Sequence, residues 1–345
     1  MLCLKHSPAI NNNVNITSKK ILVTGGCGYI GSHIVRAFKQ ANPLNEVVVI
    51  DRVKRDHTLE YADGWFIDDF ASSASLALIA NKQFDIIVHC AGTSLVGPSV
   101  LDPADYWYNN VVKTVRMLDV LKELDNSTTI MFSSSASVYG EPQQLPIPET
   151  HKLGSINPYG NTKATVERLL RDYCIAYDMS SVCFRYFNAA GAAFDSTLGQ
   201  EPGATHIIAR ALEASINNLE FVLYGDDYNT PDGTCIRDYV HVEDIALAHV
   251  QAADFLLKNS SPTYHSRINR VYNLGTGHGI SNREILQYIK DHYGLLPVAT
   301  APRRPGDPAE LVADPAKAGE ELGWSAKHSD IATIVDSAHR WYSRV

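Results

Sequence analysis

The sequence predicts an α/β fold in which a doubly wound parallel sheet is followed by a smaller α/β C-terminal domain. Three observations lead to this prediction. Short apolar runs alternate with amphipathic stretches from residue 20 onward, and a glycine-rich turn joins the first run to the first amphipathic stretch. The chain also has 345 residues, of which 45% are hydrophobic, enough for one large core and a smaller one.

The alternation of runs and stretches defines the expected elements in order. Short apolar runs are typical of buried parallel strands, and we expect them at Lys20–Thr24, Glu46–Ile50, Phe84–Cys90, Thr129–Ser133 and Val182–Arg185. The amphipathic stretches predict crossover helices at Gly31–Ala41, Tyr106–Leu124 and Tyr159–Tyr177. Strands and helices in this order favour a parallel sheet with helices on both faces.

A change in composition after residue 190 predicts the domain organisation. Gly, Pro and Asp become frequent around 191–203, 225–234 and 302–308. We expect residues 1–18 to be a disordered tail and residues 19–190 to form the main domain. A segment near 235–278 is expected to return to that domain, and residues 191–345 are expected to form mainly the second one.

Composition excludes several classes of function. The net charge is −8 and no basic block accompanies it, which argues against nucleic acid as a partner. Six scattered cysteines without a CxxC pair, and histidines without ligand spacing, predict reduced thiols and no metal site. No apolar run reaches the roughly 18 residues of a membrane span, and the first residues do not resemble an export signal. We therefore expect a cytoplasmic protein.

The glycine-rich turn predicts a dinucleotide site. Gly25, Gly28 and Gly31 join an apolar strand to an amphipathic helix, the context in which backbone N–H groups and the helix dipole bind a pyrophosphate. Asp51 follows at the end of the second predicted strand, where a carboxylate accepts hydrogen bonds from the adenosine ribose and repels a 2′-phosphate. The pattern therefore predicts a Rossmann domain that binds NAD rather than NADP.

Tyr159 and Lys163 form a candidate general base. Four residues apart on a helix, they share one face. A phenol has a pKa of about 10, and a nearby ammonium favours the phenolate, which can take a proton from a hydroxyl group. The spacing alone arises often by chance, so the neighbouring motifs must decide whether the pair is catalytic.

Further segments extend the pattern over nearly all of residues 20–324. They are Thr24–Ser32, His89–Gly92, Phe132–Gly140, Pro158–Lys163, Arg185–Asn188, Gly225–Asp244, Tyr272–Gly277, Arg303–Asp307 and Glu321–Trp324. In order and spacing they resemble the extended short-chain dehydrogenase/reductase superfamily, and within it the UDP-glucose (UDP-galactose) 4-epimerases. The glycine turn is shared by the whole superfamily, whereas Gly225–Asp244 and Arg303–Asp307 are far more specific.

The resemblance implies a reversible oxidation. Such an epimerase inverts a sugar carbon that bears no acidic proton, so Tyr159 would remove the 4-hydroxyl proton while hydride passes from C4 to NAD. The 4-keto intermediate would then turn over and receive the hydride on its other face, leaving NAD tightly bound and regenerated. Lys163 would lower the tyrosine pKa and hydrogen-bond the nicotinamide ribose, and Ser135 would bridge the sugar hydroxyl and the tyrosine.

The resemblance also implies two sets of binding residues. The expected cofactor contacts are Gly25, Gly28, Tyr29, Ile30, Gly31, Asp51, Asp69, Phe70, Ala91, Gly92, Asn109, Ser133, Tyr159, Lys163 and Tyr186. The expected contacts to the UDP-sugar substrate are Ser135, Tyr159, Asn188, His206, Tyr224, Arg237, Arg304, Asp307 and Leu311. Two arginines suit a diphosphate because each guanidinium donates a fork of hydrogen bonds. His241 and Asp244 are interpreted as structural.

Four positions depart from the family pattern. Ser94 replaces a lysine that often holds the cofactor pyrophosphate, and Lys113 stands where many relatives have glycine. His206 replaces an asparagine of the best-known members. Leu311 aligns with the residue beside the sugar 2-position, where a tyrosine restricts the site to glucose and galactose and a small residue admits N-acetyl sugars. A leucine leaves UDP-GlcNAc and UDP-GalNAc open as substrates.

Several alternatives share the fold. Dehydratases of the superfamily need an Asp-Glu pair where this chain has Ala136–Ser137, and UDP-uronate decarboxylases fit Gly225–Asp244 less well. A UDP-pentose (arabinose or xylose) 4-epimerase shares nearly all of the motifs and stays open. A non-catalytic NAD-binding regulator would usually lack the tyrosine or the lysine, and both are present here.

Relatives form homodimers by pairing the helix after Tyr106 with the helix that bears Tyr159. The apolar face at Val112, Val115, Leu118 and Leu121 is compatible with a homodimer and equally with packing on the protein's own sheet.

Overall fold

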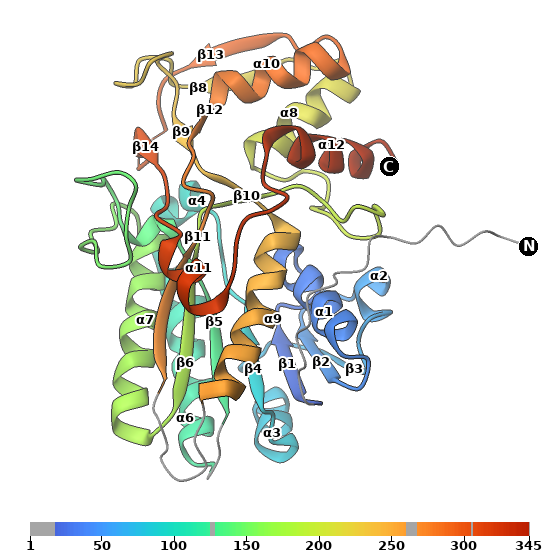
Figure 1. Cartoon of the computed structure of the whole chain (residues 1–345), viewed down its shortest axis with the longest axis vertical. Coiled ribbons are helices and arrows are strands. Elements are labelled where there is room, and N and C mark those ends of the chain that lie inside the picture. The colour runs from blue at the N-terminus through green and yellow to red at the C-terminus, as the bar shows by residue number, and fades with distance from the viewer. Residues whose placement is uncertain (1–17, 125–127, 260–267, 305, 345) are drawn as a thin grey trace, which may run out of the picture.

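The computed structural model describes residues 18–124, 128–259, 268–304 and 306–344. Figure 1 shows a larger lobe, built around one sheet with its covering helices, and a smaller lobe at the top of the view. The expected tail over residues 1–18 lies, apart from Ser18, outside the described residues. Within the described part of the chain no helix has both the length and the apolarity that a membrane crossing requires.

A seven-stranded parallel sheet forms the centre of the larger lobe. Its strands are β1 (Lys20–Thr24), β2 (Glu46–Asp51), β3 (Gly64–Ile67), β4 (Ile86–His89), β5 (Thr129–Ser135), β6 (Ser180–Tyr186) and β11 (Asn269–Leu274). Their spatial order is β11-β6-β5-β4-β1-β2-β3, and every neighbouring pair is parallel. The chain winds outward from β1 in one direction and from β4 in the other, which opens a crevice at their carboxyl ends. The predicted doubly wound sheet is confirmed.

Helices cover both faces of this sheet because its strands bury side chains on both sides. Ile21 and Val23 of β1 join one apolar cluster, and Leu22 between them joins the opposite one. The first cluster receives α1 (Tyr29–Ala41), α9 (Val242–Asn259) and α11 (Ala316–Leu322). The second receives α3 (Ser73–Lys82), α6 (Lys113–Lys122) and α7 (Pro158–Tyr177).

The predicted elements differ from the observed ones mainly at their ends. The expected strand Phe84–Cys90 is shorter in the structure, whereas the expected strand Val182–Arg185 extends to all of β6. The expected helix over Tyr106–Leu124 is interrupted, since α5 (Pro103–Tyr106) leads into a π-helix, η1 (Trp107–Val112), before α6 begins. This π-helix borders the cofactor end of the cavity described below, the kind of place where such segments occur.

The smaller lobe contains three helices and short two- and three-stranded sheets among the described residues. The helices α8 (Ile207–Ile216), α10 (Asn282–Tyr293) and α12 (Ile331–Tyr342) share one apolar cluster. The strands pair as β7 (Asn188–Ala190) with β10 (Tyr239–His241), β8 (Phe221–Tyr224) with β13 (Val298–Ala301), and β9 (Ile236–Arg237) with β12 (Ile280–Ser281) and β14 (Glu310–Leu311).

The remaining short elements lie in connecting segments. They are α2 (Asp56–Leu59), α4 (Val96–Leu101) and the 3₁₀-helix η2 (Ala136–Val138). A small apolar cluster joins the lobes, because Val138 and Tyr139 after β5 pack with Phe187 after β6 and with Leu311 of β14. The two lobes therefore meet where the central strands end.

Candidate active site

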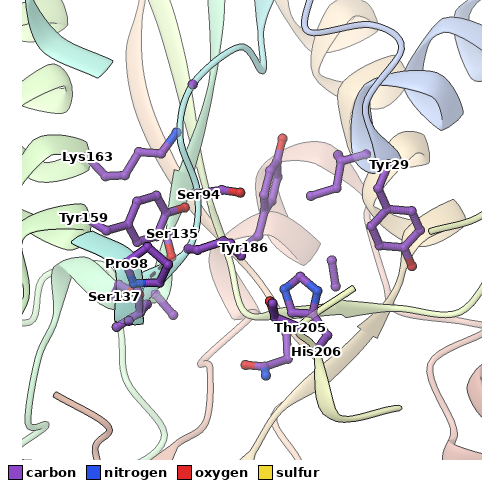
Figure 2. Close-up of a pocket in the computed structure, with 18 of the residues that line it drawn as sticks. Tyr29, Ser94, Pro98, Ser135, Ser137, Tyr159, Lys163, Tyr186, Thr205 and His206 are labelled. Carbon is purple, nitrogen blue, oxygen red and sulfur yellow. Dashed lines mark hydrogen bonds between the residues drawn. The ribbon is translucent and has the colours of Figure 1, made fainter. Parts of the chain in front are cut away.

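The helix that bears Tyr159 and Lys163 begins just before the tyrosine. Pro158 is its first residue, where the missing N–H costs nothing, and the Asn157 side chain accepts a hydrogen bond from Gly160 N at 2.9 Å. Figure 2 shows both side chains projecting from α7 toward the cavity, with Ser135 beside the tyrosine. Tyr159 is 8% exposed and Lys163 is 5% exposed.

Lys163 is held by the end of β5. Its ammonium donates a hydrogen bond to the Ser133 carbonyl oxygen at 2.7 Å and lies 5.7 Å from the centre of the Tyr159 ring. Burial lowers the pKa of Lys163 to about 8, against smaller opposing effects of Cys90 and Glu167. A lysine in this state still carries its charge for much of the time near neutral pH.

The protein alone does not lower the pKa of Tyr159, which corrects the sequence-based expectation for the pair. Burial raises this pKa to about 12, and Tyr106 adds to the rise, while the Ser135 hydroxyl opposes it. The physical reason is that removing a phenolate from water costs more than the hydroxyl neighbour returns. Forming the phenolate is therefore costly in the free protein.

The three consecutive serines at the end of β5 face different partners because side chains alternate along a strand. All three residues line the cavity that also contains Tyr159. The Ser135 oxygen also accepts a hydrogen bond from Ser137 N at 3.2 Å, which caps the following 3₁₀ turn. Ser134 donates instead to the buried Glu167 carboxylate at 2.5 Å, on the side of the structural core.

The glycine turn lies at the amino end of α1. A Cβ on Gly31 would overlap the Gly25 carbonyl oxygen, and Gly25 itself has φ +70° and lies against the backbone of Ala91. Asp51 at the end of β2 accepts hydrogen bonds from Cys27 N at 2.9 Å and from Val53 N at 3.0 Å. The carboxylate thus sits beside a cradle of backbone that side chains would fill, an arrangement that fits a dinucleotide.

Two of the expected cofactor contacts are joined by a lysine. The Lys113 ammonium lies 2.6 Å from the Asp69 carboxylate and 2.6 Å from the Asn109 side-chain oxygen. This pair, together with hydrogen bonding by backbone, lowers the pKa of Asp69 against the effect of burial. Asp69, Phe70 and Asn109 all line the cavity. The Lys113 charge is therefore committed to this wall, and it does not replace the charge missing at Ser94.

Two tyrosines of the predicted cofactor set have their hydroxyl groups engaged elsewhere. The Tyr29 hydroxyl donates to the Gly191 carbonyl oxygen at 2.6 Å, and the Tyr186 hydroxyl lies 2.9 Å from the His249 ring nitrogen. Their rings line the cavity, as Figure 2 shows. Both residues therefore present apolar ring surface to the site.

Cations gather at the other end of the cavity. Arg237 on β9 donates to the carbonyl oxygens of Ile236 and Ala309, at 2.9 Å and 3.3 Å, and lies 3.8 Å from Asp307. The Arg304 guanidinium carbon lies 4.1 Å from the centre of the Tyr224 ring. Among the described residues, the carboxylate near the Arg237 guanidinium is that of Asp307, and Asp238 and Asp244 have other partners.

The acids and the histidine near Arg237 in sequence have partners within the protein, and for His241 and Asp244 this agrees with their interpretation as structural residues. Asp238 accepts hydrogen bonds from Thr276, Gly277 and Ala313, and Asp244 accepts them from His328 and Ser329. His241 bonds to Ser337 at 3.0 Å and is buried. These residues hold the two lobes together away from the cavity.

One cavity of about 1010 Å³ is lined by every residue of the expected catalytic, cofactor and substrate sets. Beside those already described, its wall includes Ile30, Gly92, Asn188, His206 and Leu311. Leu311 is 7% exposed and packs in the cluster between the lobes. His206 begins α8, and one of its ring nitrogens lies 2.5 Å from the Gln200 side-chain nitrogen. The cavity thus brings the candidate catalytic, cofactor and substrate residues together.

Known proteins with this fold are similar along nearly the whole chain. A family model described as GDP-mannose 4,6 dehydratase matches residues 22–336. A UDP-glucose 4-epimerase of Halalkalibacterium halodurans is 38% identical over 93% of this chain and 95% of its own length. The chain belongs to the UDP-glucose 4-epimerase family.

Solved structures agree with this family assignment. The crystal structure of UDP-glucose 4-epimerase from Brucella ovis in complex with NAD is 41% identical, with a TM-score of 0.85 over 94% of this chain and 98% of that one. The UDP-Glc/GlcNAc 4-epimerase from Campylobacter jejuni is 37% identical, with a TM-score of 0.78 over 95% of this chain and 100% of that one.

The residues that follow Ser135 lack the side chains that a dehydratase needs. Ala136 is buried in the apolar cluster between the lobes, and the Ser137 backbone is tied to Ser135. Neither side chain can supply the acid and base that elimination of water requires. The local chemistry therefore agrees with the epimerases of the family.

The sequence analysis missed polar residues that line the same cavity. Four of them lie toward the smaller lobe: Gln200, Thr205, Arg210 and Asn282. Arg210 lies one helical turn after His206 on α8, so the spacing of four residues was the signal that could have found it. The other three come from loops and helix ends, where no pattern in the sequence marks their direction.

Proposed function

We propose that this protein is an NAD-dependent UDP-sugar 4-epimerase that interconverts UDP-glucose and UDP-galactose by transient oxidation at C4. One observation carries the proposal: a single cavity holds a candidate base, a dinucleotide cradle and a cluster of guanidinium groups. Hydride transfer from a bound sugar to a bound cofactor requires the base, the cofactor site and the substrate site to adjoin one another. In this protein all three line the same cavity.

Tyr159 and Ser135 would move the proton. The phenol accepts the proton of the sugar 4-hydroxyl, with Ser135 as a hydrogen-bonded bridge between the two oxygens, and returns it after the sugar has turned over. Both groups line the cavity, and Tyr159 is buried. Lys163, fixed by Ser133, would keep a positive charge beside the tyrosine and donate to a ribose hydroxyl.

NAD would be held by the glycine cradle, by Asp51 and by the wall that contains Asp69 and Phe70. When bound, it supplies a reversible hydride acceptor and a positive ring, the additional charge that the raised pKa of Tyr159 calls for. The diphosphate of the sugar nucleotide would bind Arg237 and Arg304, with Tyr224 and Asp307 beside the nucleoside. Asn188 and Leu311 would then face the hexose.

Leu311 supports a range of sugars that includes the N-acetyl forms. A leucine leaves more space beside the sugar 2-position than a tyrosine would, and the similar Campylobacter jejuni structure is that of a UDP-Glc/GlcNAc 4-epimerase. We therefore propose slower conversion of UDP-GlcNAc and UDP-GalNAc in addition to the hexose pair. UDP-arabinose lacks the hydroxymethyl group and is the alternative substrate to be tested.

The test is to incubate the purified protein separately with UDP-galactose, UDP-GalNAc and UDP-arabinose, without added NAD. We expect UDP-galactose to be converted fastest, by NAD that was retained through purification. Activity that appears only after NAD is added would indicate weak retention, which the serine at Ser94 could explain. If UDP-arabinose were the only substrate converted, the protein would be a UDP-pentose 4-epimerase. If no substrate were converted even with NAD present, the proposal would be contradicted.

We also propose a cytoplasmic homodimer. The described cysteines are free thiols, which fits a reducing compartment. Leu118 and Leu121 pack on the protein's own sheet, but Val112 on η1 is 46% exposed and Leu101 on α4 is 87% exposed. Exposed apolar residues on neighbouring helices suit an interface between copies. Light scattering at several concentrations would test it, and a monomer throughout would contradict it.

A further inference from the structure

We propose that Arg210, which no motif singled out, is a third binding cation for the nucleotide diphosphate of the substrate. The inference rests on the proposed function, since the anion is that of a UDP-sugar. Arg210 lies on α8, whereas Arg237 lies on β9 and Arg304 in the segment between β13 and β14. All three nevertheless line the same cavity.

Two guanidinium groups share one aromatic ring at this end of the cavity. The guanidinium carbon of Arg304 lies 4.1 Å from the centre of the Tyr224 ring, and that of Arg210 lies 5.8 Å from it. Arg210 is also 5.0 Å from the centre of the Phe221 ring. Contact with an aromatic face positions a cation but leaves its charge and its N–H donors unsatisfied.

The neighbouring arginines have carboxylates close to them, whereas Arg210 and Arg304 do not among the described residues. Arg303 is paired with Asp227 at 2.6 Å, and Arg237 approaches Asp307 at 3.8 Å. Among the residues that the structure describes, the guanidinium groups of Arg210 and Arg304 make contacts with aromatic rings but no hydrogen bond or ion pair. Both are therefore free to donate to a ligand in the cavity.

The electrostatics of Arg210 agree with this geometry. Burial lowers the pKa of its guanidinium, and the positive charge of Arg304 lowers it further, against weaker effects of Tyr224 and Glu213. Like charges brought together without a counter-ion destabilise the free protein. A dianionic diphosphate would relieve this repulsion, and the aromatic rings beside the cations favour an anion that carries a flat heterocycle.

The experiment measures UDP binding rather than turnover. UDP is titrated by calorimetry into the purified, NAD-loaded full chain and into its Arg210→Gln, Arg210→Lys and Arg340→Gln variants. Arg340 is exposed on α12 in the same lobe and controls for the change in net charge. We expect Arg210→Gln to weaken UDP binding about 5- to 20-fold, Arg210→Lys to weaken it less, and Arg340→Gln to leave it unchanged.

Two further measurements keep the outcome unambiguous. The loss in Arg210→Gln should shrink at high salt, and binding of uridine, which lacks the diphosphate, should be unaffected. UDP binding by Arg210→Gln within twofold of the parent protein would overturn the proposal, as would an equal loss with uridine. If the parent protein itself fails to bind UDP, the proposed function fails and this inference fails with it. NAD content and melting temperature establish that each variant is folded.

Discussion

The two ends of the cavity differ in the structural elements and the charged groups that form them. The cofactor end is formed by the carboxyl edge of the seven-stranded sheet, where backbone shape dominates and the charged groups have partners within the protein. Asp51 accepts hydrogen bonds from backbone, and Asp69 is bonded to Lys113. The substrate end is formed by short strands and connecting segments, and two of its guanidinium groups have no carboxylate partner among the described residues.

The difference suits the different fates of the two ligands. A rigid, shaped cradle with satisfied charges favours one molecule that stays bound, because little reorganisation accompanies its binding. Unsatisfied cations on less regular structure favour an anion that binds quickly and leaves again.

Tyr159→Phe tests the point at which both ends meet. Without the phenolic oxygen the proton of the sugar hydroxyl has no acceptor, so we expect turnover to fall about 10²- to 10⁴-fold. NAD content and UDP binding should be unchanged. Tyr173→Phe is the matched control, because Tyr173 lies on the same helix and its hydroxyl bonds to Asp119 at 3.0 Å. Undiminished cellular function in Tyr159→Phe would favour the non-catalytic regulator.

Gly31→Ala tests the shape of the cofactor end. The new Cβ would overlap the Gly25 carbonyl oxygen, so the turn must open and we expect the purified protein to lose most of its NAD. NAD released on denaturation is measured by chromatography. In the control Gly64→Ala the new Cβ has its nearest neighbour at 3.8 Å, on Val48. Full NAD content in Gly31→Ala would contradict the assigned cradle.

Leu311→Tyr tests the selectivity of the substrate end. A larger side chain in this buried position should narrow the space beside the sugar 2-position. We expect kcat/KM for UDP-GalNAc to fall about 10-fold or more relative to that for UDP-galactose. Leu311→Met conserves volume and should preserve the ratio. An unchanged ratio in the tyrosine variant would remove Leu311 from the sugar site.

Lys113→Met tests the charged contact of Lys113 with Asp69 in the cofactor wall. Loss of the ammonium frees Asp69 and Asn109, and we expect NAD to dissociate about 3- to 10-fold faster. Free NAD, separated from the protein by filtration at successive times and measured by chromatography, would follow the release. Lys122→Met removes a lysine further along the same helix, whose partner Asp119 lies outside the cavity wall. Equal rates of NAD release from both variants would show that the contacts of Lys113 with Asp69 and Asn109 do not slow NAD dissociation.

The sheet could be predicted from sequence because each of its central strands is a contiguous apolar run. The edge strand β3 was missed, since its residues alternate between half-buried and exposed and give no continuous run. The π-helical turn at η1 was also missed, because its apolar spacing does not differ from that of an ordinary helix. Fold class depends on local patterns, whereas these details depend on what packs against them.

The candidate site divides in the same way. The glycine turn and the Tyr159–Lys163 pair are short motifs whose chemistry is visible in the sequence. Arg210 could not be assigned to the site from sequence, because only the fold brings its guanidinium group close to the Tyr224 ring that Arg304 also contacts. The direction of the Tyr159 pKa was likewise out of reach, because it depends on burial, which spacing does not reveal.

The central claim is that hydride leaves C4 of the sugar and returns to the same carbon within one cavity. UDP-galactose deuterated at C4 is mixed with a ¹³C-labelled, undeuterated sample, and the UDP-glucose formed is analysed by mass spectrometry and NMR. The account predicts that deuterium stays at C4 of the molecules that carried it, without transfer to the ¹³C-labelled product. Loss of deuterium to water, or its exchange between the two populations, would contradict it.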